Sequence, residues 1–359
     1  MTKKVLVLGG YGACGSHISR LLARDAGIAC VIGGRDAVRG GALADELGAL
    51  FVPVDITRPA SLNAALEGVF AVVNACGPFH WQDYTVAERC ARRGVHYVDF
   101  ATDRGYVLGI AKLSPQAAGS GAALVSGGGS LLALSSVLAD AIRDPFDTID
   151  RIDVAVSYGG GCQRGVAAMR ALLYGQRLPA QVHEEGVWRQ APGWSRGQVV
   201  EWPAPLGRRR LYAVDAPEVS LFAERYGAPV TYRAGLESPA MNHALAWLGS
   251  MSRMGIIGDL PSRAGLVHGL YRWMRGSGQA RFGLRVSLTG TRDQRELVRS
   301  AGLVAEDRDM AAHCAPVLAL VRRWIAGQVI AGAGPFLGLL SLADMTEELQ
   351  QSKAVLLLS

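Results

Sequence analysis

Residues 5–15 read Val5-Leu6-Val7-Leu8-Gly9-Gly10-Tyr11-Gly12-Ala13-Cys14-Gly15, an uncharged apolar run that ends in a glycine-rich turn. A continuous apolar run of this kind is typical of a buried parallel strand. After the turn, Ile18, Leu21 and Leu22 recur at helical spacing, and the segment 28–32 is apolar again. The chain therefore opens with a β-α-β unit.

The same alternation continues as far as residue 125. Helix-like segments are 36–47, 60–66, 83–93 and 106–118, and strand-like segments are 50–53, 69–75, 95–100 and 122–125. Alternation at this pace is typical of a doubly wound parallel sheet with helices packed on it. We therefore expect an α/β fold that begins with a Rossmann-type domain.

Beyond residue 126 strand-like and helix-like segments no longer alternate regularly. Strand-like stretches at 149–157, 182–188, 230–233 and 282–288 stand between helices and loops rich in Pro and Gly. This pattern predicts an α+β second domain, and a helix candidate at 342–350 is expected to return to the first domain. The expected division is residues 1–126, completed by 330–359, for the first domain and residues 127–329 for the second.

Composition narrows the class of protein. Half of the 359 residues are hydrophobic and 19% are charged, so the chain can bury two cores. No apolar run reaches the roughly 20 residues of a membrane-spanning helix, and no signal-peptide pattern precedes the first strand. We therefore expect a cytoplasmic protein without stable membrane insertion.

Charge and cysteine spacing argue against a nucleic-acid-binding, metal-binding or disulfide-rich protein. The formal net charge is +6, but the basic residues are scattered and Arg208-Arg209-Arg210 is the only tight run, so nucleic-acid binding is not expected. The six cysteines are dispersed, with no Cys-x-x-Cys pair. Neither a metal site nor a disulfide framework is expected from that spacing.

The glycine-rich turn has the spacing of a dinucleotide-binding loop. Gly10, Gly12 and Gly15 fit the pattern G-x-G-x-x-G. Gly9, Gly12 and Gly15 fit the related pattern G-x-x-G-x-x-G. In such loops the glycines permit a tight turn, close approach of the backbone to a pyrophosphate, and close packing of the helix on the strand. The predicted pyrophosphate-binding residues are Gly9, Gly10, Tyr11, Gly12, Ala13, Cys14 and Gly15.

The end of the second strand distinguishes two nicotinamide cofactors. It reads Gly33-Gly34-Arg35-Asp36, without the carboxylate with which NAD-binding proteins hold the ribose hydroxyls. Gly34 leaves room for a 2′-phosphate, and the Arg35 guanidinium can bind it. We therefore expect NADP(H) rather than NAD(H). In the alternative interpretation Arg35 is a solvated turn residue and Asp36 is the N-cap of the following helix.

Two more strand ends complete the expected cofactor site. Asp55, followed by Ile56, comes after the third strand, where its carboxylate could bond the adenine amino group or cap the next helix. The fourth strand ends in Asn74-Ala75-Cys76-Gly77-Pro78, at the carboxyl edge of the parallel sheet. The nicotinamide lies at that edge in such folds, and small residues there let the ring approach.

Together these motifs resemble a known family, the saccharopine dehydrogenase-like reductases. The matching stretches are 9–15, 34–35, 74–79, 82–84, 94–99 and 103–104, and, less closely, 332–336 and 338–342. The resemblance implies an NADP-binding Rossmann domain, a substrate domain with a mixed sheet that often serves dimerisation, and hydride transfer at C–N bonds of amino-acid-derived substrates. The second domain departs from it, because no carboxylate-binding arrangement is recognisable there and Gly127-Gly128-Gly129-Ser130 replaces an Asp-Pro-Gly turn.

Hydride transfer needs a proton donor beside the reacting atom. The loops and strand ends after the cofactor motifs supply five candidates, which are Cys76, His96, Tyr97, Asp99 and Asp103. Asp99 could instead cap a turn, and His96 could be a packed strand residue. No tyrosine is followed four residues later by lysine, which excludes the short-chain dehydrogenase mechanism.

Three functions remain open at this stage. The leading hypothesis is an NADP-dependent oxidoreductase that acts on a C=N or C=O bond of a small substrate. A reductase of an apolar enoyl or keto substrate is the first alternative, because the second domain is rich in tryptophan and lacks a recognisable carboxylate site. The second alternative is a non-catalytic NADP(H) sensor. A small-molecule substrate and a second copy of the chain are the expected partners.

Overall fold

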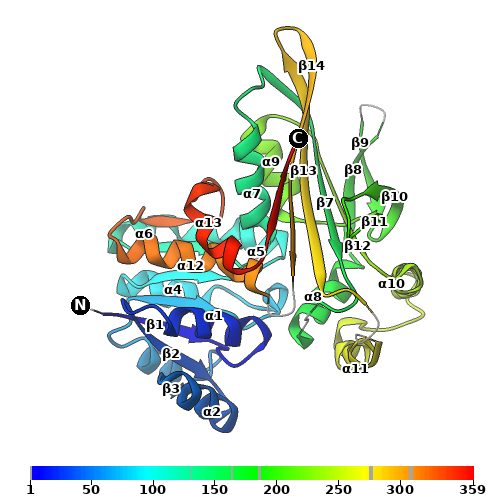
Figure 1. Ribbon diagram of the computed structural model, residues 1–359. Coiled ribbons are helices and arrows are strands. Elements are labelled where there is room, and N and C mark those ends of the chain that lie inside the picture. Colours follow the sequence, from blue (N-terminus) through cyan, green and yellow to red (C-terminus); the bar gives the residue numbers. More distant parts are fainter. Residues whose placement is uncertain (1, 130, 163–164, 185–186, 275–277, 307–309) are drawn as a thin grey trace. The chain divides into compact units, whose positions relative to one another are not determined.

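The computed structural model describes residues 2–129, 131–162, 165–184, 187–274, 278–306 and 310–359 (Figure 1). The chain divides into two compact units, which are described separately. Unit 1 contains residues 1–133 and 309–340, and unit 2 contains residues 134–308 and 341–359. The boundary at 133/134 falls inside helix α7, Leu131–Ile142.

Unit 1 is built on a seven-stranded parallel sheet with the order β15-β6-β5-β4-β1-β2-β3. Its strands are β1 Lys3–Leu8, β2 Ile28–Gly34, β3 Leu50–Pro53, β4 Ala71–Asn74, β5 His96–Asp99, β6 Ala123–Ser126 and β15 Gly332–Pro335. Leu6, Leu8, Val72, Tyr97 and Leu124 form its core with neighbouring helices. These strands read as apolar runs because helices cover both faces of a parallel sheet.

The helices of unit 1 form two groups. They are α1 Ala13–Ala23, α2 Ala37–Leu47, α3 Pro59–Ala65, α4 Thr85–Arg93, α5 Arg104–Gly109, α6 Ser114–Ser120 and α12 Ala311–Ile325. Helix α1 packs against α2 and α12, whereas α4 packs against α6. Right-handed crossovers place α1 and α2 on one face of the sheet and α4 on the other, because the strand order reverses between β1 and β4.

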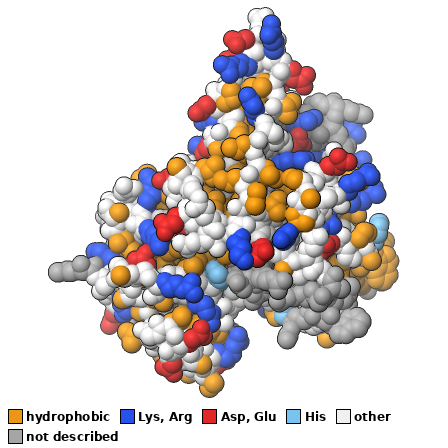
Figure 2. Space-filling model, in the orientation of Figure 1, with side chains coloured by type: hydrophobic (Ala, Val, Ile, Leu, Met, Phe, Trp, Pro, Cys, Tyr) orange, Lys and Arg blue, Asp and Glu red, His pale blue; other side chains and the backbone are white. Residues whose placement is uncertain are grey.

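Unit 2 contains a mixed seven-stranded sheet with the order β10-β11-β12-β7-β13-β14-β16. Its strands are β7 Thr148–Tyr158, β10 Ser195–Glu201, β11 Arg208–Ala213, β12 Val230–Leu236, β13 Arg281–Arg292, β14 Arg295–Glu306 and β16 Val355–Leu358. Only β12 and β7 pair in parallel. Figure 2 shows hydrophobic side chains gathered on the visible face of this sheet, over β13, β14 and β16.

The remaining elements of unit 2 surround this sheet. They are the hairpin of β8 Pro179–Glu184 and β9 Val187–Pro192, and the helices α8 Val166–Gly175, α9 Pro217–Tyr226, α10 Pro239–Arg253, α11 Ala264–Met274 and α13 Thr346–Gln351. Among the described residues, no helix has the length and apolar character needed to cross a membrane.

The observed architecture confirms the expected fold class and corrects the expected division of the chain. Helix α12, placed in the second domain from the sequence, belongs to unit 1. The predicted helix at 342–350, observed as α13, belongs to unit 2 together with β16. The physical reason is strand pairing, because β15 adds to β6 of the parallel sheet whereas β16 adds to β14 of the mixed sheet.

Candidate cofactor-binding and active site

The candidate site lies at the carboxyl edge of the parallel sheet, where β1 and β4 are neighbours. The strand register aligns Leu8 with Gly33 and Asn74, and aligns Asn74 with Asp99. The glycine-rich loop therefore leaves β1 between the ends of β2 and β4, and β5 ends on the other side of β4. Ligands of open parallel sheets bind at such a reversal of strand order, because the loops separate there and leave a crevice.

The glycine-rich loop has the shape that a pyrophosphate requires. Gly9 has a φ of +71°, in the left-handed region, and its carbonyl accepts a hydrogen bond from the Gly12 N–H at 2.9 Å. A Cβ added to Gly15 would lie 2.0 Å from the Gly9 oxygen, so only glycine lets α1 approach the loop this closely. Gly12, the N-cap of α1, has no side chain to bond the N–H groups of the first turn. Uncapped N–H groups at the start of a helix are the donors that a pyrophosphate needs.

Tyr11 shapes the end of β2. A Cβ added to Gly34 would lie 2.3 Å from the Tyr11 ring, so glycine at this position makes room for the tyrosine and not, as expected from the sequence, for a 2′-phosphate. The Tyr11 hydroxyl accepts a hydrogen bond from the Asp36 N–H at 2.9 Å. The Asp36 carboxylate accepts one from the Arg39 N–H at 3.0 Å and is the N-cap of α2. The alternative role considered for Asp36, a helix cap, is confirmed.

Two guanidinium groups flank the end of β2. Arg35 is exposed, and its positive charge contributes to the lowered pKa of Asp55 and opposes the rise that burial causes in the pKa of Cys76. The Arg39 guanidinium lies 5.2 Å from the centre of the Tyr11 ring, and its Nη2 is 3.4 Å from the Tyr11 carbonyl oxygen. Sequence reasoning missed Arg39. Its position in the first turn of the helix that follows Arg35 was the available signal.

Asp55 closes the turn before α3. Its Oδ1 accepts hydrogen bonds from the Thr57 hydroxyl at 2.7 Å and the Thr57 N–H at 3.0 Å, and these bonds hold the pKa of Asp55 below its usual value. Its own N–H donates to the Ser61 hydroxyl. Ile56, between Asp55 and Thr57, is half-buried. The N-cap of α3 is Arg58, so Asp55 does not cap this helix as the alternative had it, and the bond to adenine stays a prediction.

Buried hydrogen bonds shape the loop after β4. The fully buried Asn74 donates from Nδ2 to the Tyr97 hydroxyl at 3.1 Å, and its Oδ1 accepts from the Cys76 N–H at 3.1 Å. The Gln82 amide donates to the Cys76 carbonyl, and the Gly77-Pro78 peptide is cis. Burial raises the pKa of the Cys76 thiol to about 11, so this group is a neutral thiol at physiological pH. Its Sγ lies against Gly9 of the glycine-rich loop.

Asp99 joins the ends of β5 and β6. Its Oδ1 accepts three hydrogen bonds, from the Ala101 N–H at 3.0 Å, the Ser126 hydroxyl at 3.0 Å and the Gly127 N–H at 2.8 Å. Its Oδ2 is buried and meets no hydrogen-bond partner of standard geometry among the described residues. Burial raises the pKa of Asp99 to about 6, against the lowering effect of those three bonds and of the neighbouring Tyr97 hydroxyl. Asp99 can therefore gain or lose a proton near neutral pH.

The Tyr97 hydroxyl is buried between two hydrogen-bond partners and is not an accessible acid. Its hydroxyl lies 3.3 Å from the Tyr106 hydroxyl, and the Tyr84 hydroxyl donates to the Tyr106 carbonyl at 2.8 Å. Burial raises the pKa of Tyr97 well above its ordinary value of 10. The hydrogen bonds from Asn74 through Tyr97 to Tyr106 hold the β4 and β5 ends together beside Asp99.

Two of the five predicted catalytic residues have structural roles. His96 lies three residues before Asp99 on β5, about 10 Å from the carboxyl edge at the usual rise of a strand. Its Nδ1 accepts from the Ala123 N–H at 3.1 Å, and its ring packs against Phe70 and Trp324. The expectation for His96 is therefore corrected. Asp103 is the N-cap of α5, and its carboxylate accepts from the Tyr106 N–H at 2.9 Å.

Comparison with known proteins agrees with this geometry. Residues 5–125 match the model of a family described as the saccharopine dehydrogenase NADP binding domain. This part of unit 1 is therefore similar to a saccharopine dehydrogenase-type NADP-binding domain. The match confirms the family resemblance and the expectation of NADP(H). This NADP-binding domain carries the glycine-rich loop, Arg35 and Asp99 within the matched residues.

Solved structures extend the similarity beyond the NADP-binding domain. The apo saccharopine dehydrogenase (L-Glu forming) from Saccharomyces cerevisiae has 14% sequence identity and a TM-score of 0.68, over 99% of this chain and 100% of that chain. This likeness concerns the fold. GenD2 from gentamicin A biosynthesis, solved in complex with NAD, has 13% identity and a TM-score of 0.47, over 99% of this chain and 96% of that chain. No curated protein sequence matches the chain.

Proposed function

We propose that this protein is an NADP-dependent oxidoreductase that transfers a hydride between NADP(H) and a C=N or C=O bond of a small, amino-acid-derived or related substrate. The observation that carries the proposal is the combination, within one matched domain, of a glycine loop open to a pyrophosphate and two guanidinium groups at the end of β2. The saccharopine dehydrogenase-like fold of the whole chain supports the reaction class.

The cofactor-binding roles follow from the positions of the residues. The N–H groups at the start of α1 bind the pyrophosphate, and Arg35 and Arg39 bind the 2′-phosphate. The segment 74–78 lies beside the glycine-rich loop and borders the nicotinamide, which supplies the hydride when the cofactor is bound. Asp55 and Ile56 border the adenine.

Asp99 is the proposed proton donor. Its pKa of about 6 lies near the pH at which an acid-base group works best, and its Oδ2 has no bonded partner of standard geometry among the described residues. Cys76 and Tyr97 hold their protons too tightly to release them at neutral pH. Tyr97 and Asn74 position the strand ends around Asp99.

Titration of the purified protein with NADPH and with NADH, followed by nicotinamide fluorescence, tests the cofactor assignment. We expect selective NADPH binding by the wild type and loss of binding in Gly12→Val. A Cβ at Gly12 would lie 3.1 Å from the Gly9 oxygen, so this variant needs only a small shift to fold. Gly119→Ala, at an exposed position of α6 where an added Cβ meets no atom within 4 Å, is the control. Retained NADPH affinity in Gly12→Val would show that the loop does not contact the cofactor.

A substrate screen tests the reaction. Oxidation of NADPH is followed with imino acids and keto acids in one set and enoyl thioesters in the other. Turnover with the first set supports the proposal, and turnover only with enoyl thioesters favours the apolar-substrate alternative.

A non-catalytic NADP(H) sensor is the second candidate function. The observation that favours it is the complete burial of Asp99 and Tyr97, which leaves the cofactor site better defined than any accessible catalytic group. Tight NADPH binding without oxidation of NADPH in either substrate set would support this candidate. The homodimer and the cytoplasmic location stay predictions, and the mass of the protein in solution would test the first.

A further inference from the structure

Three arginines and one aspartate share a face of the mixed sheet of unit 2. Arg233 on β12 and Arg285 on β13 are both paired in register with Ala155 on β7. Residues that are directly paired across strands point to the same face of a sheet, and alternate residues of one strand do so as well. Asp153 and Arg151 therefore lie on this face too. We refer to Arg151, Asp153, Arg233 and Arg285 as the arginine cluster.

The single carboxylate of the cluster is shared. The Asp153 Oδ2 is 2.8 Å from the Arg151 Nε, and its Oδ1 is 3.7 Å from an Arg233 Nη1. Asp153 is also the carboxylate whose charge acts on Arg285. Three positive charges and one negative charge leave the cluster with a formal charge of +2.

Arg285 is the least compensated member of the cluster. Its guanidinium lies 5.5 Å from the Trp202 ring centre, and its Nη1 donates to the Glu201 carbonyl at 3.0 Å. Burial lowers the pKa of Arg285, which is the direction expected for a cation removed from water without a full counter-charge. Among the described residues, no carboxylate forms an ion pair with it.

The other carboxylates near this face are already engaged. Glu237 binds Arg209 at 3.2 Å and accepts from the N–H groups of Gly160 and Gln279. The exposed Glu201 carboxylate lies 3.7 Å from Arg208. A partly buried cation without its own carboxylate is stabilised by an anion from solution, because burial of an unpaired charge is unfavourable.

The surroundings of the cluster suit a small oxyanion. Ala155 between the two arginines is small and is buried beside Trp202 and Leu211, and the Ser287 and Ser300 hydroxyls, which share a hydrogen bond of 2.8 Å, lie on the adjoining strands. Strand spacing puts the Cα atoms of Arg233 and Arg285 about 10 Å apart, so both side chains can reach one group. Planar guanidinium groups bind carboxylate and phosphate oxygens in pairs of hydrogen bonds.

We propose that the arginine cluster is a binding site for an oxyanion, the carboxylate or phosphate group of a small ligand, with Arg285 as its principal contact. The site belongs to unit 2 and does not depend on the cofactor assignment. Asp153 orients Arg151 and Arg233 and competes with the ligand for their charge.

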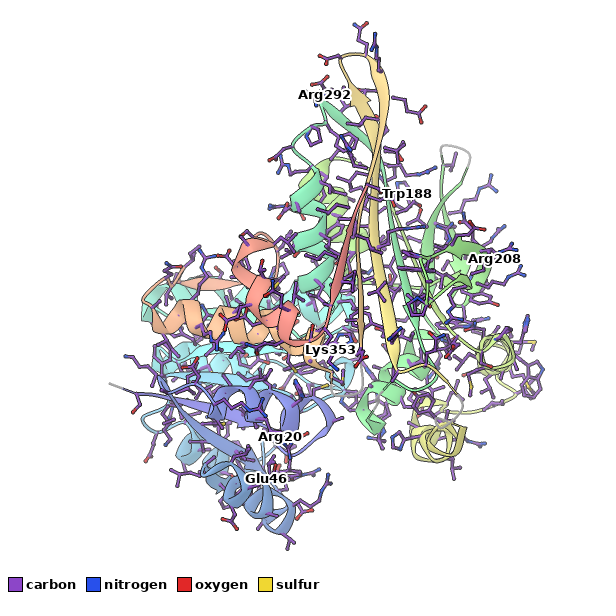
Figure 3. All side chains as sticks on the ribbon, in the orientation of Figure 1. Arg20, Glu46, Trp188, Arg208, Arg292 and Lys353 are labelled. Atoms are coloured by element: carbon purple, nitrogen blue, oxygen red, sulfur yellow. The ribbon has the colours of Figure 1, made fainter. Side chains whose placement is uncertain are left out.

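Isothermal titration of the full-length protein with inorganic phosphate, and separately with glutarate, tests the site. We expect wild-type protein to bind at least one of the two anions, which identifies the ligand class. Arg285→Gln should weaken that binding about tenfold or more through loss of a charge-assisted pair of bonds. Asp153→Asn should tighten it, because the competing carboxylate is gone. Arg292→Gln, at the exposed tip of the β13–β14 hairpin (Figure 3), should leave it unchanged.

Two results would overturn the proposal. One is the absence of binding of either anion by the wild type. The other is equal affinity in wild type, Arg285→Gln and Arg292→Gln, which would mean an adventitious ion only. NADPH titration of the same proteins keeps the two proposals apart, because failure to bind NADPH would contradict the proposed function without bearing on the anion measurement.

Discussion

Single residues set the shape and the charge at the end of β2. Gly34 is glycine because the Tyr11 ring occupies the space of a side chain. Asp36 is the carboxylate in this turn, and its side chain accepts a hydrogen bond from the Arg39 N–H as the N-cap of α2. Arg35 and Arg39 are therefore the charged side chains that remain available at this strand end.

Arg35→Ala and Arg39→Ala should each weaken NADPH binding much more than NADH binding. One charge-assisted contact contributes about 1.5–3 kcal/mol, so we expect a loss of roughly tenfold to a hundredfold for NADPH. The dissociation constants come from nicotinamide fluorescence. Arg92→Ala, an exposed arginine paired with Glu88 on α4, serves as control. Equal losses for NADPH and NADH would contradict contact with the 2′-phosphate.

The pH dependence of turnover should report on Asp99. Burial keeps this carboxyl protonated up to about pH 6, whereas its ordinary pKa is 3.8. If Asp99 donates the proton during reduction, kcat falls as the pH rises through about 6. Asp99→Asn should lower kcat and remove that inflection from the profile. An unchanged inflection in Asp99→Asn would assign the proton transfer to another group.

At the scale of elements, two helices distant in the chain support the cofactor loop. Helices α1 and α12 run in the same direction, because the Cys14 Sγ meets the Met310 Sδ at 3.3 Å near their starts and Asp25 pairs with Arg322 at 2.9 Å near their ends. Trp324 of α12 is almost fully buried against His96. The start of α1, which carries the glycine-rich loop, is therefore held in place by a helix outside residues 5–125, the part that matches the family model.

A buried acid between helices α7 and α9 should make unit 2 sensitive to pH. Glu218, in the first turn of α9, accepts a hydrogen bond from the Ser135 hydroxyl of α7 at 2.9 Å. Burial raises the pKa of Glu218 from 4.5 to about 7. Because the folded-state pKa is the higher one, the contribution of this group to stability is greatest below pH 4.5 and is lost as the pH rises towards 7.

Glu218→Gln should remove that loss. Relative to wild type, the variant should gain of order 3 kcal/mol in the free energy of unfolding between pH 4.5 and pH 8, since one pKa unit corresponds to about 1.4 kcal/mol. Urea unfolding at the two pH values measures the change. Ser135→Ala removes the hydrogen bond but keeps the buried acid, and should retain the pH dependence. A Glu218→Gln curve parallel to that of wild type would refute the assignment.

At the scale of the molecule, the chain passes between the two units three times, at 133/134, at 308/309 and at 340/341. Each unit is therefore completed by a distant segment. Unit 1 receives α12 and β15, and unit 2 receives α13 and β16. Strand β16 pairs with β14 from Ala301 to Val304 and covers that edge of the mixed sheet.

Removal of residues 341–359 should therefore affect the two units differently. NADPH affinity should stay within about twofold of wild type, because the parallel sheet and α12 are retained. Unit 2 should lose stability, because the edge of β14 loses its hydrogen-bonded partner. Thermal unfolding by calorimetry, with and without NADPH, separates the two effects. Loss of NADPH binding in a truncated protein that remains folded would show that these residues also support the cofactor site.

The sequence alone determined the β-α-β unit, the glycine-rich loop, the preference for NADP(H) and the fold class, because each rests on contacts between residues close together in the chain. The tertiary structure decided which candidates share the carboxyl edge. It placed Asp99 at that edge and His96 in the core. Both residues lie on β5, and the strand register shows that the Asp99 end of β5 is aligned with the end of β4. It also assigned α12 and β16 to their units, brought Arg39 onto Tyr11 and gathered Arg151, Arg233 and Arg285 around Asp153. Pairing between distant strands sets these positions, and no local pattern encodes it.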